Sequence, residues 1–234
     1  MDFKIYEKEL CTAIKNVVIK IIEENPIMNI PSRSRSGAEI SDFLEACFVS
    51  KVNDNANPLL SDASQAPPGA TKNPFDAKCT FEFQDREELI WIDFKACKIS
   101  SADSNPDIGT PKKVVEFIKD GHFYLVYVIV YYTAEGDTSV FAKFNNEFVK
   151  VYSLKDVNHT FRLNPKPQLQ VNISAEPEYR TREEFIEILI QKHYESYDRQ
   201  LKSIAEKRSK LEDLKEDLIK ANKVSESRVN YKVK

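Results

Sequence analysis

The sequence predicts an α/β fold, in which helices flank a mixed central β-sheet and a long helix forms the C-terminal part. Three observations predict it. Apolar residues recur at helical spacing near both ends of the chain, an alternating pattern typical of a hairpin lies between them, and residues 123–132 form an almost wholly apolar run. A run of this length, rich in β-branched and aromatic residues, is typical of a strand buried on both faces. The 234 residues contain no strong boundary, so we expect one domain over 1–234.

The first half of the chain is expected to contain two helices and a loop. Apolar residues spaced three and four apart predict a helix from residue 2 to about 24, which Asn25-Pro26 ends. A second apolar pattern predicts a helix over about 38–52. Residues 53–74 are rich in Asn, Ser, Ala, Pro and Gly, which predicts a long loop.

The second half is expected to contain two further helices. Thr110 at the N-cap and Pro111 at the first helical position predict a helix that ends at Asp120-Gly121. The buried strand follows it. Residues 181–184 read Thr-Arg-Glu-Glu, a capping box that opens a helix reaching about residue 220, with the last dozen residues frayed. Shorter strands are expected over 140–144, 148–154 and 168–173.

The C-terminal helix carries a weak heptad-like stripe of apolar residues. Its members are Tyr197, Leu201, Ile204, Leu211, Leu214 and Leu218. The stripe has two interpretations. The helix either docks on its own domain, or forms an arm over about 181–222 that packs on a partner subunit or lies beside DNA, leaving a core over about 1–180.

Composition narrows the function classes. The net charge is −3, which gives no indication of a nucleic-acid partner, although a local face can still be basic. The four cysteines are scattered, no secretion signal is recognisable and no run of eighteen apolar residues occurs. We therefore expect a cytoplasmic protein without a membrane partner. The sequence contains no Gly-rich phosphate loop, so no nucleotide cofactor is expected.

A hairpin in the middle of the chain carries the candidate chemistry. Alternating residues over 79–83 and 89–94, with a polar turn over 84–88, predict two paired strands. Asp93 and Lys95 are two residues apart and so point to one face, and Asp76 enters the first strand beside them. Two carboxylates can hold a hard cation such as Mg²⁺, and an ammonium can position or activate a water. This set of groups suits metal-assisted hydrolysis of a phosphodiester.

The alternative is a surface ion pair between Asp93 and Lys95 on an edge strand, without chemistry. The pair follows Trp91 on one face of the strand, which favours a cleft over open solvent.

The segment from Asn73 to Lys95 resembles the signature of the PD-(D/E)xK nucleases, with Asp76, Asp93 and Lys95 at its positions. One residue separates Pro74 from Asp76 here, a variation that is ordinary in that family. Nearly the whole chain resembles the SwaI family of type II restriction endonucleases, and the blunt-cutting HincII group is similar more distantly. The segments that carry the wider likeness are 37–45 (GAEISDFLE), 91–96 (WIDFKA), 103–109 (DSNPDIG), 164–168 (NPKPQ) and 179–185 (YRTREEF).

The resemblance implies a restriction-endonuclease-like core and a homodimer that cuts both strands of a palindromic site in double-stranded DNA. It implies Mg²⁺ as cofactor, and it suggests an A/T-rich site of eight base pairs and blunt ends. Asp76, Asp93 and the backbone carbonyl of Phe94 would bind the metal. An acid from the second helix often completes such sites, with Glu39 the first candidate and Glu45 the second. A glutamate near a helix N-terminus is equally favoured by the helix dipole, so both interpretations of Glu39 stay open.

Four polar segments are candidates for DNA contact. Arginines before the second helix suit phosphate contact, and the loop after the catalytic strand suits base reading, with Asn105 the best match to adenine. The alternative for the arginines is a solvated connector, and the alternative for the loop with Asn105 is an Asx-rich turn. The DNA-binding candidates are Arg33, Arg35, Gln65, Ser100, Ser104, Asn105, Asp107, Lys166, Gln168 and Gln170.

Two other functions remain as alternatives to a restriction enzyme. One is a catalytically silent DNA-binding dimer, which would not need Asp76, Asp93 and Lys95 together. The other is a PD-(D/E)xK nuclease of repair or recombination.

Overall fold

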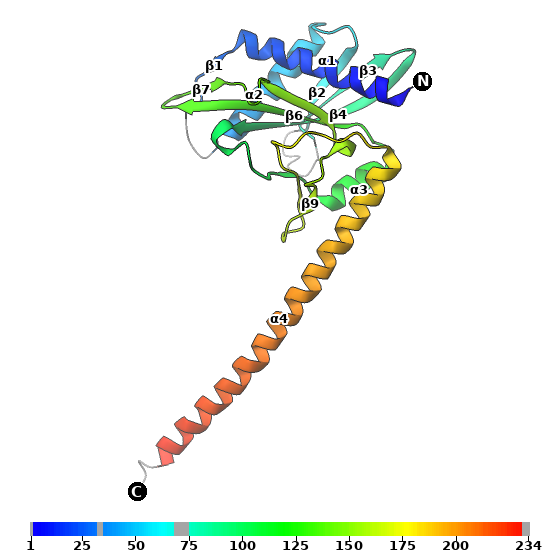
Figure 1. The fold of residues 1–234 in the computed structure, drawn as a ribbon. Coiled ribbons are helices and arrows are strands. Elements are labelled where there is room, and N and C mark those ends of the chain that lie inside the picture. The colour runs from blue at the N-terminus through cyan, green and yellow to red at the C-terminus, as the bar shows by residue number, and fades with distance from the viewer. Residues whose placement is uncertain (1, 32–34, 68–74, 231–234) are drawn as a thin grey trace.

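The computed structural model describes residues 2–31, 35–67 and 75–230, with side chains as far as residue 223. Helices cover both faces of a mixed β-sheet, and a long C-terminal helix leaves the body (Figure 1). The fold class predicted from the sequence is therefore confirmed.

The helices are α1 (Phe3–Glu24), α2 (Ser36–Asn53), α3 (Pro111–Lys119) and α4 (Arg182–Asn230), with short 3-10 turns η1 (Ile99–Ser101) and η2 (Leu154–Asp156). The main sheet contains β1 (Ile27–Met28), β2 (Leu60–Gln65), β3 (Ala77–Phe83), β4 (Arg86–Lys98), β6 (Leu125–Glu135), β7 (Thr138–Phe141) and β8 (Val149–Ser153). A small second sheet contains β5 (Asp107–Gly109), β9 (Arg162–Leu163) and β10 (Leu169–Gln170).

The main sheet has the strand order β1-β7-β6-β4-β3-β2, and β8 pairs with β6 on the same edge as β7. β4 and β6 run parallel, and the pairings of β3 with β4 and of β6 with β7 are antiparallel. The strand that bears Asp93 and Lys95 is therefore held between β3 and β6 in the middle of the sheet.

Alternate residues of β6 face two separate cores, which explains why this strand reads as a continuous apolar run. Val126, Val128 and Val130 pack in the core under α1 and α2. Leu125 and Ile129 pack on the opposite face, in the core that also contains residues of α3, β9, β10 and the start of α4. The prediction of a buried central strand is confirmed.

The hairpin and the preceding loop differ in detail from the prediction. Gln84 and Asp85 both have positive φ, so they form the two-residue turn whose twist matches paired strands, and β4 begins at Arg86. The expected loop over 53–74 contains β2, which pairs with β3. That strand was missed because only Leu60 and Ala63 are buried within it and its register shifts, which leaves no clean alternation.

The short strands lie close to their expected places, although β10 has only two residues. The capping box of α4 forms as predicted: the Thr181 backbone N–H donates to the Glu184 carboxylate at 2.7 Å, and the Glu184 N–H donates to the Thr181 hydroxyl at 3.2 Å. The helix continues to Asn230, ten residues beyond the expected end, because no Gly or Pro interrupts residues 221–230. Within the described ranges, no helix combines the length and apolar character that crossing a membrane requires.

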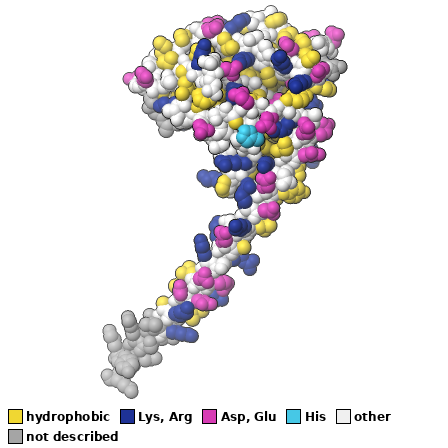
Figure 2. All heavy atoms as spheres, viewed as in Figure 1, with side chains coloured by type: hydrophobic (Ala, Val, Ile, Leu, Met, Phe, Trp, Pro, Cys, Tyr) yellow, Lys and Arg dark blue, Asp and Glu magenta, His cyan; other side chains and the backbone are white. Residues whose placement is uncertain are grey.

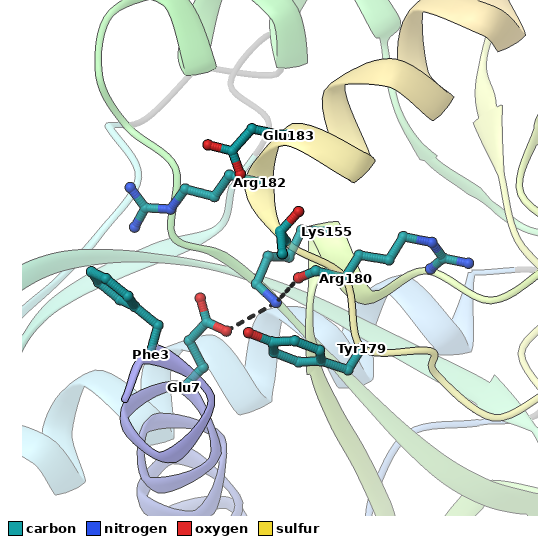
Figure 3. Close-up of a pocket in the computed structure, with 8 residues that line it drawn as sticks. Phe3, Glu7, Lys155, Tyr179, Arg180, Arg182 and Glu183 are labelled. Atoms are coloured by element: carbon teal, nitrogen blue, oxygen red, sulfur yellow. Dashed lines mark hydrogen bonds and ion pairs between the residues drawn. The ribbon is translucent and has the colours of Figure 1, made fainter. Parts of the chain in front are cut away.

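A buried ion-pair network holds the start of α4 against α1 (Figure 3). Lys155, 2% exposed, places its ammonium 2.9 Å from Glu7 Oε2, 2.7 Å from Asp156 Oδ1 and 2.6 Å from the Arg180 carbonyl. Its Nζ also lies 4.1 Å from the centre of the Tyr179 ring. A pocket of about 330 Å³ adjoins the network, and its polar groups are occupied in fixing the root of the long helix.

Candidate active site

The backbone of β4 holds Asp76 at the entrance to β3. The Asp76 N–H donates to the Ile92 carbonyl at 2.8 Å, and its Oδ2 accepts from the Phe94 N–H at 2.7 Å. The second bond follows from the antiparallel register. Ala77 pairs with Ile92, so Asp76, one residue earlier, lies beside the β4 backbone that follows Ile92. The Asp76 carboxylate is therefore directed toward the residues flanking Phe94, as the hairpin pattern predicts.

Asp93 and Lys95 lie side by side on one face of β4, as their spacing predicts. Lys95 Nζ is 2.8 Å from each of the two carboxylate oxygens of Asp93. Oδ1 accepts the hydrogen bond of the ammonium, and the buried Oδ2 is in charge contact with the same ammonium but has no second partner among the described residues. The Asp93 residue is 7% exposed and its strand is internal, so the alternative of a solvated ion pair on an edge strand is wrong.

The charges of Asp76, Asp93 and Lys95 shift one another's pKa values. Burial raises the pKa of Asp93 to about 7, against a lowering by Lys95 and with a further increase from Asp76. Burial also raises the pKa of Asp76, although the Phe94 N–H and Lys95 both oppose the increase. Burial opposes the charge on Lys95, but the two aspartates outweigh it and raise its pKa. Lys95 therefore stays protonated, and burial disfavours the charged form of Asp93, which a cation would stabilise.

A pocket of about 370 Å³ opens beside these residues. Asp76, Phe94, Lys95 and Ala96 form one wall, and Gly37, Ala38, Ser41 and Asp42 of α2 form the other. The helix approaches the strand closely: the Ala96 N–H donates to the Ser41 hydroxyl at 3.1 Å, and a Cβ on Gly37 would lie 3.1 Å from the Ala96 carbonyl oxygen. The small residues of α2 thus bring its polar face onto the catalytic strand.

The acids of α2 are not arranged as the sequence ranking expected. Asp42 lines the pocket and was missed, and Glu39 is absent from the pocket lining. Burial raises the pKa of Glu45 to about 7, with added repulsion from Asp76 and Asp42, so Glu45 lies in the field of the site. Residues 38, 41, 42 and 45 share one helix face, and that spacing is the sequence signal that could have ranked Asp42 and Glu45 first.

The donor set fits a hard divalent cation. The buried carboxylate of Asp93 and the half-buried carboxylate of Asp76 repel each other here, and one oxygen of Asp93 has no partner besides the Lys95 ammonium among the described residues. A cation would neutralise both effects, and oxygen ligands are those that Mg²⁺ prefers. In the described part of the chain, no three His, Cys, Asp or Glu side chains converge on a metal position. A cation would therefore take its remaining ligands from the backbone, water or substrate.

Two of the segments expected to read DNA form one unit. Asp107 Oδ1 accepts from Asn164 Nδ2 at 3.0 Å and from Gln170 Nε2 at 2.9 Å. Thr110, the N-cap of α3, directs its hydroxyl not to its own helix but to Gln168 Oε1, at 3.3 Å. We call the small sheet β5-β10-β9, with the turn 164–168, the reading sheet. It brings the candidates Asp107, Gln168 and Gln170 together.

The other DNA-binding candidates are placed less closely together. Arg35 is exposed just before α2, and Arg33 lies outside the described residues. Gln65 ends β2 and hydrogen-bonds to Glu45, so it lies beside the acids instead of on a separate loop. The candidates after β4 and in the turn of the reading sheet are Ser100, Ser104, Asn105 and Lys166, of which Ser100 and Lys166 are exposed.

Tyr127 connects the catalytic strand to the reading sheet. It pairs with Asp93 in the register of β4 and β6, and its buried hydroxyl donates to the Ile108 carbonyl of β5. The reading sheet is therefore fixed relative to Asp93 by the central strand of the body.

Comparison with known protein families gives one match. The family model described as SwaI restriction endonuclease matches residues 2–212, nearly the full chain. No curated protein is similar enough to match. The chain thus belongs to the SwaI-like family and is a type II restriction endonuclease.

Proposed function

We propose that this endonuclease uses Mg²⁺ to hydrolyse both strands of a palindromic, A/T-rich site of eight base pairs in double-stranded DNA. It acts as a homodimer and leaves blunt ends. The observation that supports the proposed chemistry is that Asp76 and Lys95 line one pocket while Asp93, directly behind it, holds the Lys95 ammonium at 2.8 Å. The site length, symmetry and cut position rest on the likeness to the family.

Asp76, Asp93 and the Phe94 carbonyl would hold the cation. When bound, it supplies a lowered pKa for a neighbouring water and neutralises charge that builds on the scissile phosphate. The Phe94 N–H orients the Asp76 carboxylate through its 2.7 Å hydrogen bond, so one residue positions a ligand with its N–H and offers another with its carbonyl. Little reorganisation is then needed when the cation and DNA arrive.

Lys95 acts as a donor. Its pKa is raised, so it keeps its proton at neutral pH and is unsuited to abstract one. Held 2.8 Å from Asp93, it directs its remaining N–H groups into the pocket, where they orient the attacking water or stabilise the negative phosphate oxygens.

The proton lost by the water requires an acceptor. Glu45 is our first candidate, because its pKa of about 7 lets it accept and release a proton near neutral pH. Glu39 remains the alternative on the same helix.

The reading sheet recognises bases, and the arginines before α2 contact phosphate. Gln170 donates one amide N–H to Asp107, which leaves its other N–H and its carbonyl free for the bidentate pairing that suits adenine. Asn164 instead uses its Oδ1 to accept from the Lys166 and Gln168 N–H groups, so it shapes the turn. Gln170 and Gln168 are therefore the preferred readers within the reading sheet, beside Asn105 in the loop before it.

A cleavage assay tests this function. The purified protein is incubated with plasmid and phage DNA in Mg²⁺, and the fragment ends are sequenced. Discrete fragments that share blunt ends within an A/T-rich palindrome are expected. Nicking that depends on DNA structure would favour a repair nuclease, and binding without cleavage would favour a silent DNA-binding dimer.

Two variants and one matched control test the roles of Asp93 and Lys95 in cleavage. Asp93→Asn and Lys95→Ala should each lower the cleavage rate about 100-fold or more, while binding in Ca²⁺ persists. Asp85→Asn changes the same residue type at the far end of the hairpin, where Asn tolerates positive φ, and should cleave normally. Full turnover by either active-site variant would refute the assigned role.

A further inference from the structure

The outer part of α4 has no partner in the structure. Arg199 donates to the Leu163 carbonyl at 2.7 Å, close to the point where the helix leaves the body. From Ile204 to Lys223 every side chain is exposed, and Figure 1 shows this segment projecting as a single rod. Twenty residues of helix extend about 30 Å. We call residues 190–223 of α4 the arm.

An apolar stripe runs along the arm at heptad spacing. Ile190, Tyr197, Ile204, Leu211 and Leu218 recur every seven residues, and each is between 42% and 62% exposed. The companion positions are Tyr194, Leu201 and Leu214, also exposed. Leucine and isoleucine at this spacing form the seam of paired helices, and a face this apolar is seldom left in water.

The charges of the arm form two consecutive blocks of opposite sign. Residues 202–210 contain four cations (Lys202, Lys207, Arg208, Lys210) and one anion (Glu206), for a net charge of +3. Residues 211–217 contain four anions (Glu212, Asp213, Glu216, Asp217) and one cation (Lys215), for a net charge of −3. In Figure 2 the basic side chains precede the acidic ones along the rod. No ion pair of the four block cations occurs within the described part of the chain.

We propose that the arm pairs with the arm of a second copy of this chain, in antiparallel orientation. Antiparallel pairing centred between Lys210 and Leu211 places each +3 block against the −3 block of the other copy. Parallel pairing in register would place like charges together, which is unfavourable. The inference rests on the proposed homodimer and names its interface.

DNA and the protein's own body fit the arm less well. The acidic block would repel phosphates, and DNA offers no apolar cover for the leucines. The ion pairs of Lys155 and the capping box hold the root of α4, so the rod points away from the core that could otherwise cover it.

Block reversals test both the pairing and its orientation by sedimentation equilibrium of the full chain. Reversing the basic block with Lys207→Glu, Arg208→Glu and Lys210→Glu turns its net charge from +3 to −3 and should raise the dimer dissociation constant about tenfold or more. Each exposed ion pair is weak, but two-fold symmetry counts every substitution twice. Adding Glu212→Lys, Asp213→Lys and Glu216→Lys to the same chain turns the acidic block from −3 to +3, which restores opposite blocks of the original size and should return the constant to near its original value. A parallel pair would have like blocks facing in all three proteins, so an unchanged constant would overturn the proposal.

Stripe variants supply the second readout. Leu211→Ser with Leu218→Ser should weaken the dimer at least tenfold, because both side chains lie at the proposed seam. The matched control is Glu206→Ser with Lys220→Ser, on the opposite helix face and without net change of charge, which should leave the dimer intact. Every substitution is on an exposed helix surface, so the fold is retained, as circular dichroism can verify.

Other outcomes separate this inference from the proposed function. A dimer that survives all arm variants would overturn arm pairing and leave the homodimer standing. Loss of DNA retention without loss of the dimer would assign the arm to DNA and overturn the proposal. A monomeric native protein that still cuts its site would overturn the arm interface and the homodimer together, but not the nuclease chemistry.

Discussion

Asp93 is the residue on which the proposed chemistry depends most directly. The packing around β4 buries its carboxylate, whose two oxygens both lie 2.8 Å from the Lys95 ammonium. Burial raises its pKa to about 7, so the folded protein holds a proton on Asp93 more tightly than the unfolded chain does. Such a group is poised to exchange that proton for a metal ion.

The affinity for Mg²⁺ should therefore rise with pH. Between pH 6 and pH 8 Asp93 loses its proton, and we expect the apparent dissociation constant for Mg²⁺ to fall about tenfold. Calorimetric titration with Mg²⁺ at several pH values measures it, and release of protons on binding at pH 6 is a second readout. An affinity that does not change across this range would show that Asp93 is not a titrating ligand.

Metal-free stability should have the opposite pH dependence. A carboxyl with a raised folded pKa contributes stability below its unfolded value near pH 4, and this contribution is lost as pH rises through about 7. Asp93→Asn removes the penalty for charging a buried group. Thermal unfolding of the metal-free variant at pH 8 should therefore occur at a higher temperature than for the native chain, and the difference should shrink toward pH 5. A lower melting temperature at pH 8 would contradict this account.

At the scale of elements, the site is made by a hairpin and a helix that approaches it. The two-residue turn at Gln84 and Asp85 sets the register of β3 and β4, and the register places Asp76 against the Phe94 N–H. The close contact of Gly37 and Ser41 with Ala96 then brings Asp42 to the pocket.

The two glutamates of α2 offer a matched comparison. Glu45→Gln should lower the cleavage rate at neutral pH about 100-fold if Glu45 accepts the proton, whereas Glu39→Gln should change it less than tenfold. Single-turnover cleavage of a plasmid carrying one site measures both. The reverse order would restore Glu39 to first place.

The bridge made by Asp107 predicts an effect on specificity. Asp107→Ala removes the carboxylate that accepts from Asn164 and Gln170, so the Gln170 side chain is no longer held in place. Discrimination between the true site and a site with one changed base should therefore fall about tenfold. The ratio of cleavage rates on the two sites measures it. The control is Asp120→Ala at the exposed end of α3. Equal ratios for Asp107→Ala and the native protein would remove the reading sheet from recognition.

Local pattern was sufficient to predict the parts of the site that depend on strand geometry. The pairing of Asp93 with Lys95 follows from the two-residue repeat of a strand, and the position of Asp76 follows from the hairpin. Asp42 and β2 could not be predicted in this way. The place of Asp42 in the pocket depends on how closely α2 packs on β4. The strand β2 forms because a polar segment pairs with the otherwise unpaired edge of β3.

At the scale of the whole molecule, two cores share one sheet and a single helix leaves them. The sequence predicts the long helix and its stripe, but the departure of the arm depends on tertiary contacts at its root. The ammonium of Lys155 bridges Glu7, Asp156 and the Arg180 carbonyl there. Buried charges lose much of their stabilising effect when one partner is removed.

Removing the buried ammonium of Lys155 should destabilise the folded protein. Lys155→Ala leaves Glu7 and Asp156 buried without their cation, and we expect a loss of about 3 kcal/mol in the free energy of unfolding. Urea denaturation measures it, with Lys150→Ala as a comparison, since Lys150 is buried but its ion-pair partner Glu176 is largely exposed. A loss no larger than that of Lys150→Ala would show that the network does not anchor the arm.

Anomalous diffraction from crystals of the full chain with DNA and Mn²⁺ tests the central claim most directly, because it locates the cation itself. The account predicts a peak within about 2.2 Å of carboxylate oxygens from both Asp76 and Asp93, with Lys95 beside it. A peak elsewhere in a crystal whose DNA is cleaved, with these two aspartates making no contact to metal, would contradict it.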